Sequence, residues 1–297
     1  MIRRRFCIFL LTLGACFSFS SFANLQGKTL PLSKTFIGQD KFHTIVQKAT
    51  QEQWHKLPIG ERTARFGKEM IGTPYVSYTL EIDNHIEAPS ANFKGLDCWT
   101  FFEIALGLAR MVEHDKQTYI PQDLLAEIKA TRYRKGVCNG NYLDRIHYLA
   151  EWYVDNHKRK NIFDLNKKLG GERFVKECRE MTVLWKSYRY LKHNPELRAP
   201  MKKHEERISK LPIYYIPKSE VAQIEPKLQN GDVIGIATSY KGSFCSHVGL
   251  AYRDNKNVLR FMHASSDFKK VVLDVRLRDY LYRYPKKHAG ILVGRPR

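Results

Sequence analysis

Apolar positions along the chain follow two different spacings, and the change falls near residue 211. Before that point the pattern predicts helices over 40–56, 59–71, 98–112, 121–131, 141–157, 172–191 and 199–210. After it, short apolar runs bounded by turn residues predict strands over 213–216, 232–238, 247–252, 258–264, 270–275 and 290–294. Helices first and strands later indicate an α+β fold.

The segment 98–112 is apolar almost all the way round, which is typical of a helix buried in a core. Asp97 is a good N-cap residue, so Cys98 should lie in the first turn of this helix. The partial positive charge at a helix start favours a thiolate over a thiol. We therefore expect the pKa of Cys98 to be depressed and its sulfur to act as a nucleophile.

Two predicted strands carry histidines, and the polar loop 253–257 between them is a good hairpin connection centred on Asn255. In a symmetric register His247 and His263 lie directly opposite each other, with Cβ atoms about 5 Å apart. Alternation places the small residues Gly249 and Ala251 on the same face. We expect the helix that begins at Cys98 to pack closely on that face.

These residue types suit acyl transfer. Cys98 would attack an acyl carbon as a thiolate, and His247 would take its proton and later deliver a proton to the leaving amine. His263 would hold the orientation and tautomer of His247. The backbone N–H of Cys98, at a helix start, would stabilise the oxyanion.

The N-terminus has the features of an export signal over residues 1–23. A basic stretch at Arg3–Arg5 precedes an apolar run from Phe6 to Leu13, and small residues offer cleavage after Ala23. Leu13–Cys16 also resembles a lipoprotein box, which would leave a diacylated Cys16 on an outer membrane. No later run reaches about 18 apolar residues, so we expect an exported, periplasmic protein without a transmembrane segment in its mature chain.

The net charge limits the classes of binding partner, and the cysteine content limits the possible disulfides. The net charge is +20, which favours an anionic polymer or surface, while export and the lack of a nucleic-acid-binding signature speak against nucleic acid. No cofactor is expected. Beyond the signal the cysteines are Cys98, Cys138, Cys178 and Cys245, and a Cys138–Cys178 disulfide is possible in an oxidising compartment.

The order of short motifs resembles the NlpC-type cell-wall hydrolases, a papain-like superfamily of cysteine peptidases. The matching elements are Gly72–Tyr75, Asp97-Cys98, Gly231-Asp232, Ser246–Gly249 and His263. The resemblance implies a papain-like core with Cys98 as nucleophile, His247 as base, His263 as the orienting residue, and Tyr75 beside the thiol, where it helps bind substrate or steady the oxyanion.

The segment between Cys98 and His247 is much longer than is usual in that superfamily. It contains a basic, aromatic, helix-rich block over about 119–210, which the resemblance makes an insertion in a domain spanning 40–297, after an extended lead-in over 24–39. Together with the HASS and GILVGR stretches, this block resembles the N-acetylmuramoyl-L-alanine amidase-like branch. The implied substrate is peptidoglycan, cut either between N-acetylmuramic acid and L-alanine or within the stem peptide.

Two other interpretations remain open at this point. Cys98, Cys245, His247 and His263 could form a zinc centre of two thiolates and two imidazoles, giving a zinc-dependent hydrolase. Alternatively, the basic helical block could make the protein a non-catalytic module that binds the cell envelope.

Overall fold

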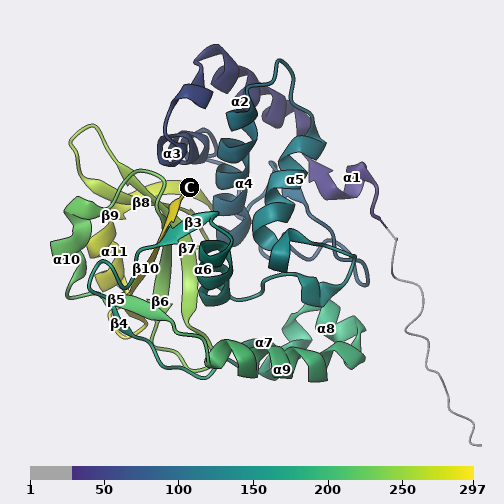
Figure 1. Ribbon diagram of the computed structural model, residues 1–297, viewed down its shortest axis with the longest axis vertical. Coiled ribbons are helices and arrows are strands. Elements are labelled where there is room, and N and C mark those ends of the chain that lie inside the picture. Colours follow the sequence, from purple (N-terminus) through teal and green to yellow (C-terminus); the bar gives the residue numbers. More distant parts are fainter. Residues whose placement is uncertain (1–28) are drawn as a thin grey trace, which may run out of the picture.

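The second half of the chain forms an antiparallel sheet with helices on both faces (Figure 1). The structure is a computed structural model that describes residues 29–297. Across the sheet the order is β4-β5-β10-β6-β7-β8-β9, and β3 also pairs with β10. The strands are β3 (Ile162–Asp164), β4 (Glu172–Arg173), β5 (Tyr214–Pro217), β6 (Val233–Thr238), β7 (Cys245–Arg253), β8 (Leu259–Ser265), β9 (Lys270–Arg276) and β10 (His288–Pro296).

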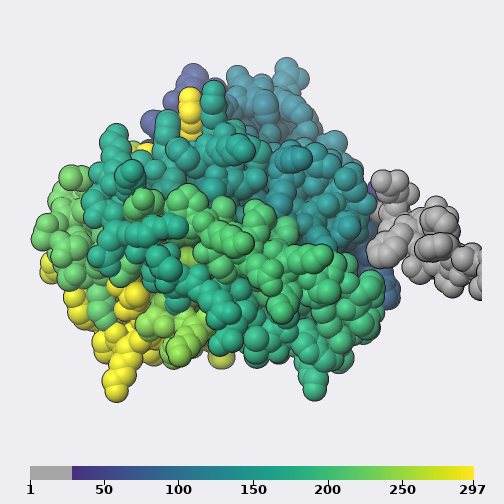
Figure 2. All heavy atoms as spheres, turned by 60° about the horizontal axis from the view of Figure 1, so that its bottom comes forward, coloured from purple at the N-terminus to yellow at the C-terminus, as the bar shows by residue number. Residues whose placement is uncertain are grey.

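Helices make up most of the chain before the sheet. The α-helices are α1 (Leu32–Thr35), α2 (Gln39–Gln51), α3 (Ile59–Glu69), α4 (Cys98–Met111), α5 (Pro121–Arg132), α6 (Leu149–Lys158), α7 (Glu180–Val183), α8 (Arg189–His193), α9 (Arg198–Ser209), α10 (Val221–Ile224) and α11 (Leu277–Arg283). Short 3₁₀ turns occupy Trp54–Lys56, Val112–His114, Arg134–Gly136, Tyr142–Asp144, Trp185–Ser187, Pro195–Leu197 and Glu225–Lys227. In Figure 2 the segment that carries α7 to α9, coloured green, faces the viewer.

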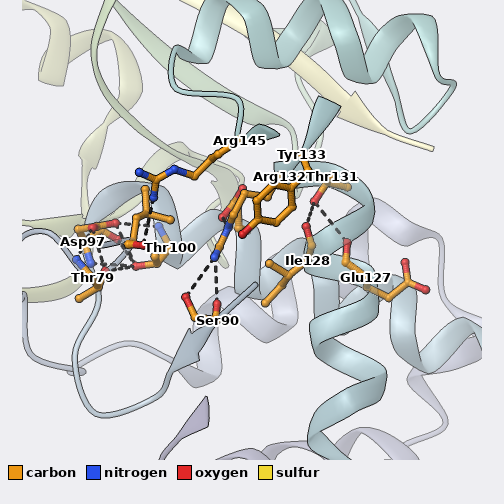
Figure 3. A network of polar contacts seen from close by, with 12 residues as sticks. Thr79, Ser90, Asp97, Thr100, Glu127, Ile128, Thr131, Arg132, Tyr133 and Arg145 are labelled. Carbon is orange, nitrogen blue, oxygen red and sulfur yellow. Dashed lines mark hydrogen bonds and ion pairs between the residues drawn. The ribbon is translucent and has the colours of Figure 1, made fainter. Parts of the chain in front are cut away.

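The central helix α4 begins at Cys98 because Asp97 caps it. The Asp97 carboxylate accepts the backbone N–H of Thr100 at 2.8 Å, and the Thr100 hydroxyl in turn accepts the backbone N–H of Asp97. Thr79 donates both its N–H and its hydroxyl to the same carboxylate, as Figure 3 shows. This reciprocal capping fixes the first turn of the helix and therefore the position of the thiol.

The two faces of the sheet carry separate apolar clusters. On one face, α4 packs through residues such as Phe101 against Leu250 and Met262 of β7 and β8. On the other face, Phe261 and the β6 side chains Ile234 and Ile236 pack under α10 and α11. Alternation along each strand divides its side chains between the two clusters, so the sheet is the middle of three layers.

A buried ion pair ties α4 to α5. Glu103 and Arg132 are fully buried and meet at 2.7 Å, and the Arg132 guanidinium also donates to the side chain and carbonyl of Ser90. Figure 3 shows Arg132 reaching from α5 to Ser90. Because a charge buried without a partner is costly, this contact fixes the loop before α4 as well as the two helices.

Most predicted elements are confirmed, but two predicted helices are wrong in whole or in part and several short elements were missed. The helices predicted at 59–71, 98–112, 121–131 and 199–210 correspond to α3, α4, α5 and α9, and each predicted strand is present. The helix predicted over 141–157 is wrong in its first part, since α6 starts at Leu149. The helix predicted over 172–191 is wrong, because β4, α7, a 3₁₀ turn and α8 occupy it, and the pattern missed α11.

The N-terminal predictions fall partly outside the described residues. The signal segment 1–23, which includes Cys16, and the first part of the lead-in lie outside the described residues. From residue 32 the lead-in is not an extended arm, because α1 is followed by β1 (Phe36–Ile37), which pairs in parallel with β2 (Ala91–Asn92). Within residues 29–297, no helix has both the length and the apolar character needed to cross a bilayer.

The buried ion pair makes the first testable prediction. Replacing Glu103 by Ala strands the Arg132 guanidinium in the core and should lower the free energy of unfolding by about 3–5 kcal/mol. Urea denaturation followed by circular dichroism measures this loss. Lys48→Ala, which breaks the exposed Lys48–Glu69 pair, is the control and should cost about 0–1 kcal/mol. Equal losses in the two variants would contradict the assigned role of the pair.

Candidate active site

A cavity of about 440 Å³ opens at the start of α4. Its wall combines the segment before α4, the first turn of α4, the region from the 142–144 turn to the start of α6, the 180–188 region and the beginning of β7. Cys98, His247, Tyr75 and Cys245 all line it. Segments far apart in the sequence therefore bring the predicted nucleophile, base and tyrosine to one cavity.

The Cys98 thiol is protonated at rest. Burial, together with the neighbouring Asp97 carboxylate, raises the pKa of Cys98 to about 12, although the backbone N–H groups of Val248, Cys98 and Trp99 favour the thiolate. The prediction of a depressed pKa is therefore wrong. The helix start does favour the anion, but desolvation and the capping carboxylate outweigh it, so the thiol needs a base to become a nucleophile.

The two histidines meet, although not in the predicted register. The β7–β8 hairpin pairs Leu250 with Met262 and Ala251 with Phe261, so its centre lies one residue later than Asn255 and the pairing is shifted by two. A shift of two keeps every side chain on its face. The His247 and His263 rings therefore meet diagonally, with Nε2 of His247 2.7 Å from Nδ1 of His263.

Gly249 permits this diagonal contact. A Cβ atom at Gly249 would lie 2.8 Å from the Cβ of His263 and 2.5 Å from the carbonyl oxygen of Met262. A side chain at this position would displace His263, so the absence of one lets the two rings approach across the strands.

The helix carrying Cys98 packs on the sheet face opposite the histidines. It contacts Val248, Leu250 and Met262, whereas the His247 and His263 rings adjoin Phe261 and Tyr280 on the α11 side. The expectation that α4 covers Gly249 and Ala251 is therefore wrong, because Val248, Leu250 and Met262 belong to the cluster under α4, whereas Ala251 belongs to the cluster on the α11 side.

Cys98 and His247 approach the cavity from different sides of β7. A register shift between Ile236 and Ala237 of β6 leaves Ser246 as an extra residue at the beginning of β7, and such bulges re-aim the neighbouring side chains. Among residues 29–297, no hydrogen bond joins the Cys98 thiol to His247, and Nδ1 of His247 has no hydrogen-bond partner. The half-buried His247 ring is therefore able to accept a proton from the cavity.

Burial also governs the protonation of His247. Desolvation holds the pKa of His247 well below its usual value near 6.5, and the neighbouring His263, His288 and Lys287 lower it further. The ring is consequently neutral at pH 7, which is the form that a general base requires.

The sequence analysis did not identify Asp274 and Arg283 as candidate site residues. Asp274 of β9 lies 3.2 Å from Nε2 of His263, and the Arg283 guanidinium at the end of α11 binds both Asp274 oxygens at 2.8 Å. Although burial opposes ionisation, the hydrogen bonds from His263 and Arg283 lower the pKa of Asp274. A carboxylate within the otherwise apolar run VVLDV at 271–275 was the available signal.

Tyr75 lies near the thiol, as the family resemblance implies. It forms an isolated bridge with Leu96, just before the cap of α4, and its N–H donates to the carbonyl of Lys269. Burial raises the pKa of Tyr75, and the Cys98 sulfur contributes to that rise. The hydroxyl is therefore protonated at neutral pH and can donate a hydrogen bond in the cavity.

The zinc arrangement considered for Cys98, Cys245, His247 and His263 is not formed. In the described part of the chain, no three His, Cys, Asp or Glu side chains converge as metal ligands, and the two imidazoles direct facing nitrogens at each other. The Cys138–Cys178 disulfide is also wrong, since Cys98, Cys138, Cys178 and Cys245 are all free thiols.

Fold and site together define an α+β protein in which a half-buried thiol and a histidine line one cavity, with a second histidine bonded to the first behind it. The family model described as AmiA-like, N-acetylmuramoyl-L-alanine amidase-like, matches residues 65–291. The chain therefore belongs to the AmiA-like family. No curated protein matches it at significant similarity.

Solved structures with a similar fold carry different names. An N-acetylmuramoyl-L-alanine amidase from Bacteroides uniformis is 30% identical, with a TM-score of 0.72, and the match covers 80% of this chain and 99% of that one. A Bacteroides fragilis protein described as a candidate xylanase is also 30% identical, with a TM-score of 0.70 and coverage of 77% and 99%. A Legionella pneumophila protein at 21% identity, TM-score 0.62 and coverage of 87% and 95% shares the fold.

The raised thiol pKa predicts slow alkylation of Cys98. Iodoacetamide reacts with the thiolate, so a folded-state pKa of about 12 should make labelling at pH 8 far slower than in the urea-unfolded chain, where thiol pKa values return to about 8.5. Mass spectrometry of the Cys98 peptide measures both rates. Rapid labelling of the folded protein at pH 6 would show that the thiol is ionised after all.

Proposed function

We propose that this protein is a cysteine-dependent amidase that cleaves an amide bond of peptidoglycan, with a papain-like core of the NlpC type. Cys98 is the nucleophile, His247 the general base and acid, and His263 the residue that orients His247. The observation that carries this proposal is His247, which lines the same cavity as the Cys98 thiol and is bonded from behind by His263. The amidase-like family supports the reaction class.

The reaction starts from a neutral thiol and a neutral imidazole. Nδ1 of His247 takes the Cys98 proton as the sulfur attacks the carbonyl carbon of the substrate amide. The backbone N–H of Cys98 and the Tyr75 hydroxyl stabilise the oxyanion. The C–N bond then breaks, the amine leaves with the proton from His247, and water hydrolyses the thioester to restore the thiol.

An amide suits this site better than a glycosidic bond. Glycoside hydrolysis normally uses two free carboxylates that flank the bond. Among the described residues, three carboxylates line the cavity. Asp97 caps α4, Glu81 accepts hydrogen bonds from Tyr142, Arg145 and the N–H of Arg189, and Glu180 accepts one from the Tyr188 hydroxyl. Each of the three is engaged by neighbouring groups of the fold, whereas the thiol and Nδ1 of His247 are not.

The bond between N-acetylmuramic acid and L-alanine is the proposed target. The Bacteroides uniformis relative is named for this activity, and Tyr78, Trp99 and Tyr188 give the cavity aromatic surfaces of the kind that pack on sugar rings. Cleavage within the stem peptide is the alternative. An export signal over residues 1–23, with lipid attachment at Cys16 as its alternative, would deliver the protein to the periplasm.

A non-catalytic envelope-binding module is the second candidate, and the net charge of +20 favours it. Digestion of purified sacculi separates the two functions. The wild-type protein should release peptides with a free L-alanine amine, detected by mass spectrometry, and Cys98→Ala should release none while still binding sacculi. Cys138→Ala, which removes a free thiol outside the cavity, is the matched control and should remain active. Binding without release by the wild type would establish the module instead.

The neutral His247 predicts an unusual pH profile. Because the protonated ring is disfavoured, the active neutral form persists as the pH falls below 6.5, and activity is lost only when the ring finally protonates. The acidic limb of kcat/KM should therefore lie well below pH 6.5, and a steady-state series between pH 4 and 8 measures it. A limb at or above pH 6.5 would contradict the assignment of His247 as the base.

A further inference from the structure

Four side chains form a continuous chain behind the cavity. His247 Nε2 contacts His263 Nδ1 at 2.7 Å, His263 Nε2 contacts Asp274 Oδ2 at 3.2 Å, and Arg283 binds both oxygens of Asp274 at 2.8 Å. His263 and Asp274 are almost fully buried, at 2% and 7% exposure. The chain runs from the cavity to α11, and water has little access to its middle.

The charged end of this chain dictates where each proton lies. An ionised carboxylate can only accept hydrogen bonds, so the contact between Asp274 and His263 requires a hydrogen on Nε2 of His263. A neutral His263 then has a bare Nδ1. The hydrogen between the two rings must consequently belong to Nε2 of His247, which leaves Nδ1 of a neutral His247 unprotonated and able to accept the thiol proton.

We propose, on the basis of the proposed function, that Asp274 is a positioning residue that sets the tautomers of both histidines, and that Arg283 holds Asp274 in place for this purpose. Two successive imidazoles transmit the orientation, so a carboxylate that never contacts the thiol or the substrate determines which nitrogen of His247 is the base. Arg283 supplies two parallel hydrogen bonds, the geometry that fixes a carboxylate most firmly.

Replacing Asp274 by Asn tests this assignment with little change of shape. Either orientation of the amide places its NH₂ group against a donor. On the Oδ2 side this donor is His263 Nε2–H or Arg283, and on the Oδ1 side it is the Val275 N–H or Arg283. The NH₂ group is expected on the Oδ2 side, because the Val275 N–H and Arg283 on the Oδ1 side cannot give up their hydrogens, whereas His263 relieves its conflict by moving its hydrogen to Nδ1. That change forces His247 to carry its hydrogen on Nδ1. Nδ1 of His247 then carries a hydrogen and cannot accept the thiol proton.

The expected result is a loss of kcat of about 10³–10⁴-fold with a nearly unchanged KM, the scale seen when a triad histidine adopts the wrong tautomer. Nitrogen-15 NMR of the histidine rings of the full chain gives a readout that a merely structural role would not move. In the wild type, Nδ1 of His247 should resonate as an unprotonated nitrogen, and in Asp274→Asn as a protonated one. Comparison with His247→Gln, which lacks this ring, identifies the resonances of His247.

Asp232→Asn is the matched control. Asp232 is also a buried aspartate bound through both oxygens by an arginine, Arg295, at 2.8 Å, but it contacts neither histidine. Its variant should lose stability without changing the tautomers or reducing kcat more than a few fold.

Arg283→Gln keeps the carboxylate on His263, so it should retain the wild-type tautomers and lose kcat by less than about tenfold, far less than Asp274→Asn.

Several outcomes would overturn the proposal. It fails if His247 of the wild type carries its hydrogen on Nδ1, a result that needs no variant to fold. It also fails if Asp274→Asn keeps the wild-type tautomers, or if Asp232→Asn loses as much kcat as Asp274→Asn. A wild type that releases no product from sacculi would refute the proposed function, while the NMR comparison would still decide the role of Asp274.

Discussion

The packing of the first turn of α4 against the beginning of β7 is the contact on which the rest of the site depends. It places the Cys98 sulfur by the backbone N–H of Val248, the residue directly after His247. The capping box of Asp97 and Thr100 fixes the helix side of this contact, and the bulge at Ser246 fixes the strand side. The thiol and imidazole therefore approach one cavity from opposite faces of the same strand.

Local sequence signals were sufficient for the elements that carry the site. The cap at Asp97 and the apolar run after it located the start of α4 at Cys98, and the alternation around His247 and His263 located two paired strands. The histidine contact survived an error of two residues in the register because strand side chains repeat every two positions. An error of one residue would have separated the rings.

Other features of the fold and the site depend on contacts between residues far apart in the sequence, and the hydrophobic pattern does not predict them. The region between α5 and α9 consists of short elements held by groups from the segment before α4: Arg145 and Tyr142 bind Glu81, and Tyr190 donates to the carbonyl of Ile86. Aromatic and basic residues in this region mimic a helical period without forming long helices. The pKa of Cys98 was mispredicted for a related reason, since burial is a property of the whole fold.

The protonated state of the resting thiol has a consequence for chemical durability. Peroxides and disulfides attack the thiolate rather than the thiol, so a cysteine that stays protonated is oxidised slowly to sulfenic acid and exchanges slowly with other thiols. The burial that makes Cys98 dependent on a base thus also shields its sulfur between reaction cycles. Such a nucleophile would remain usable in an oxidising environment without a dedicated reducing partner.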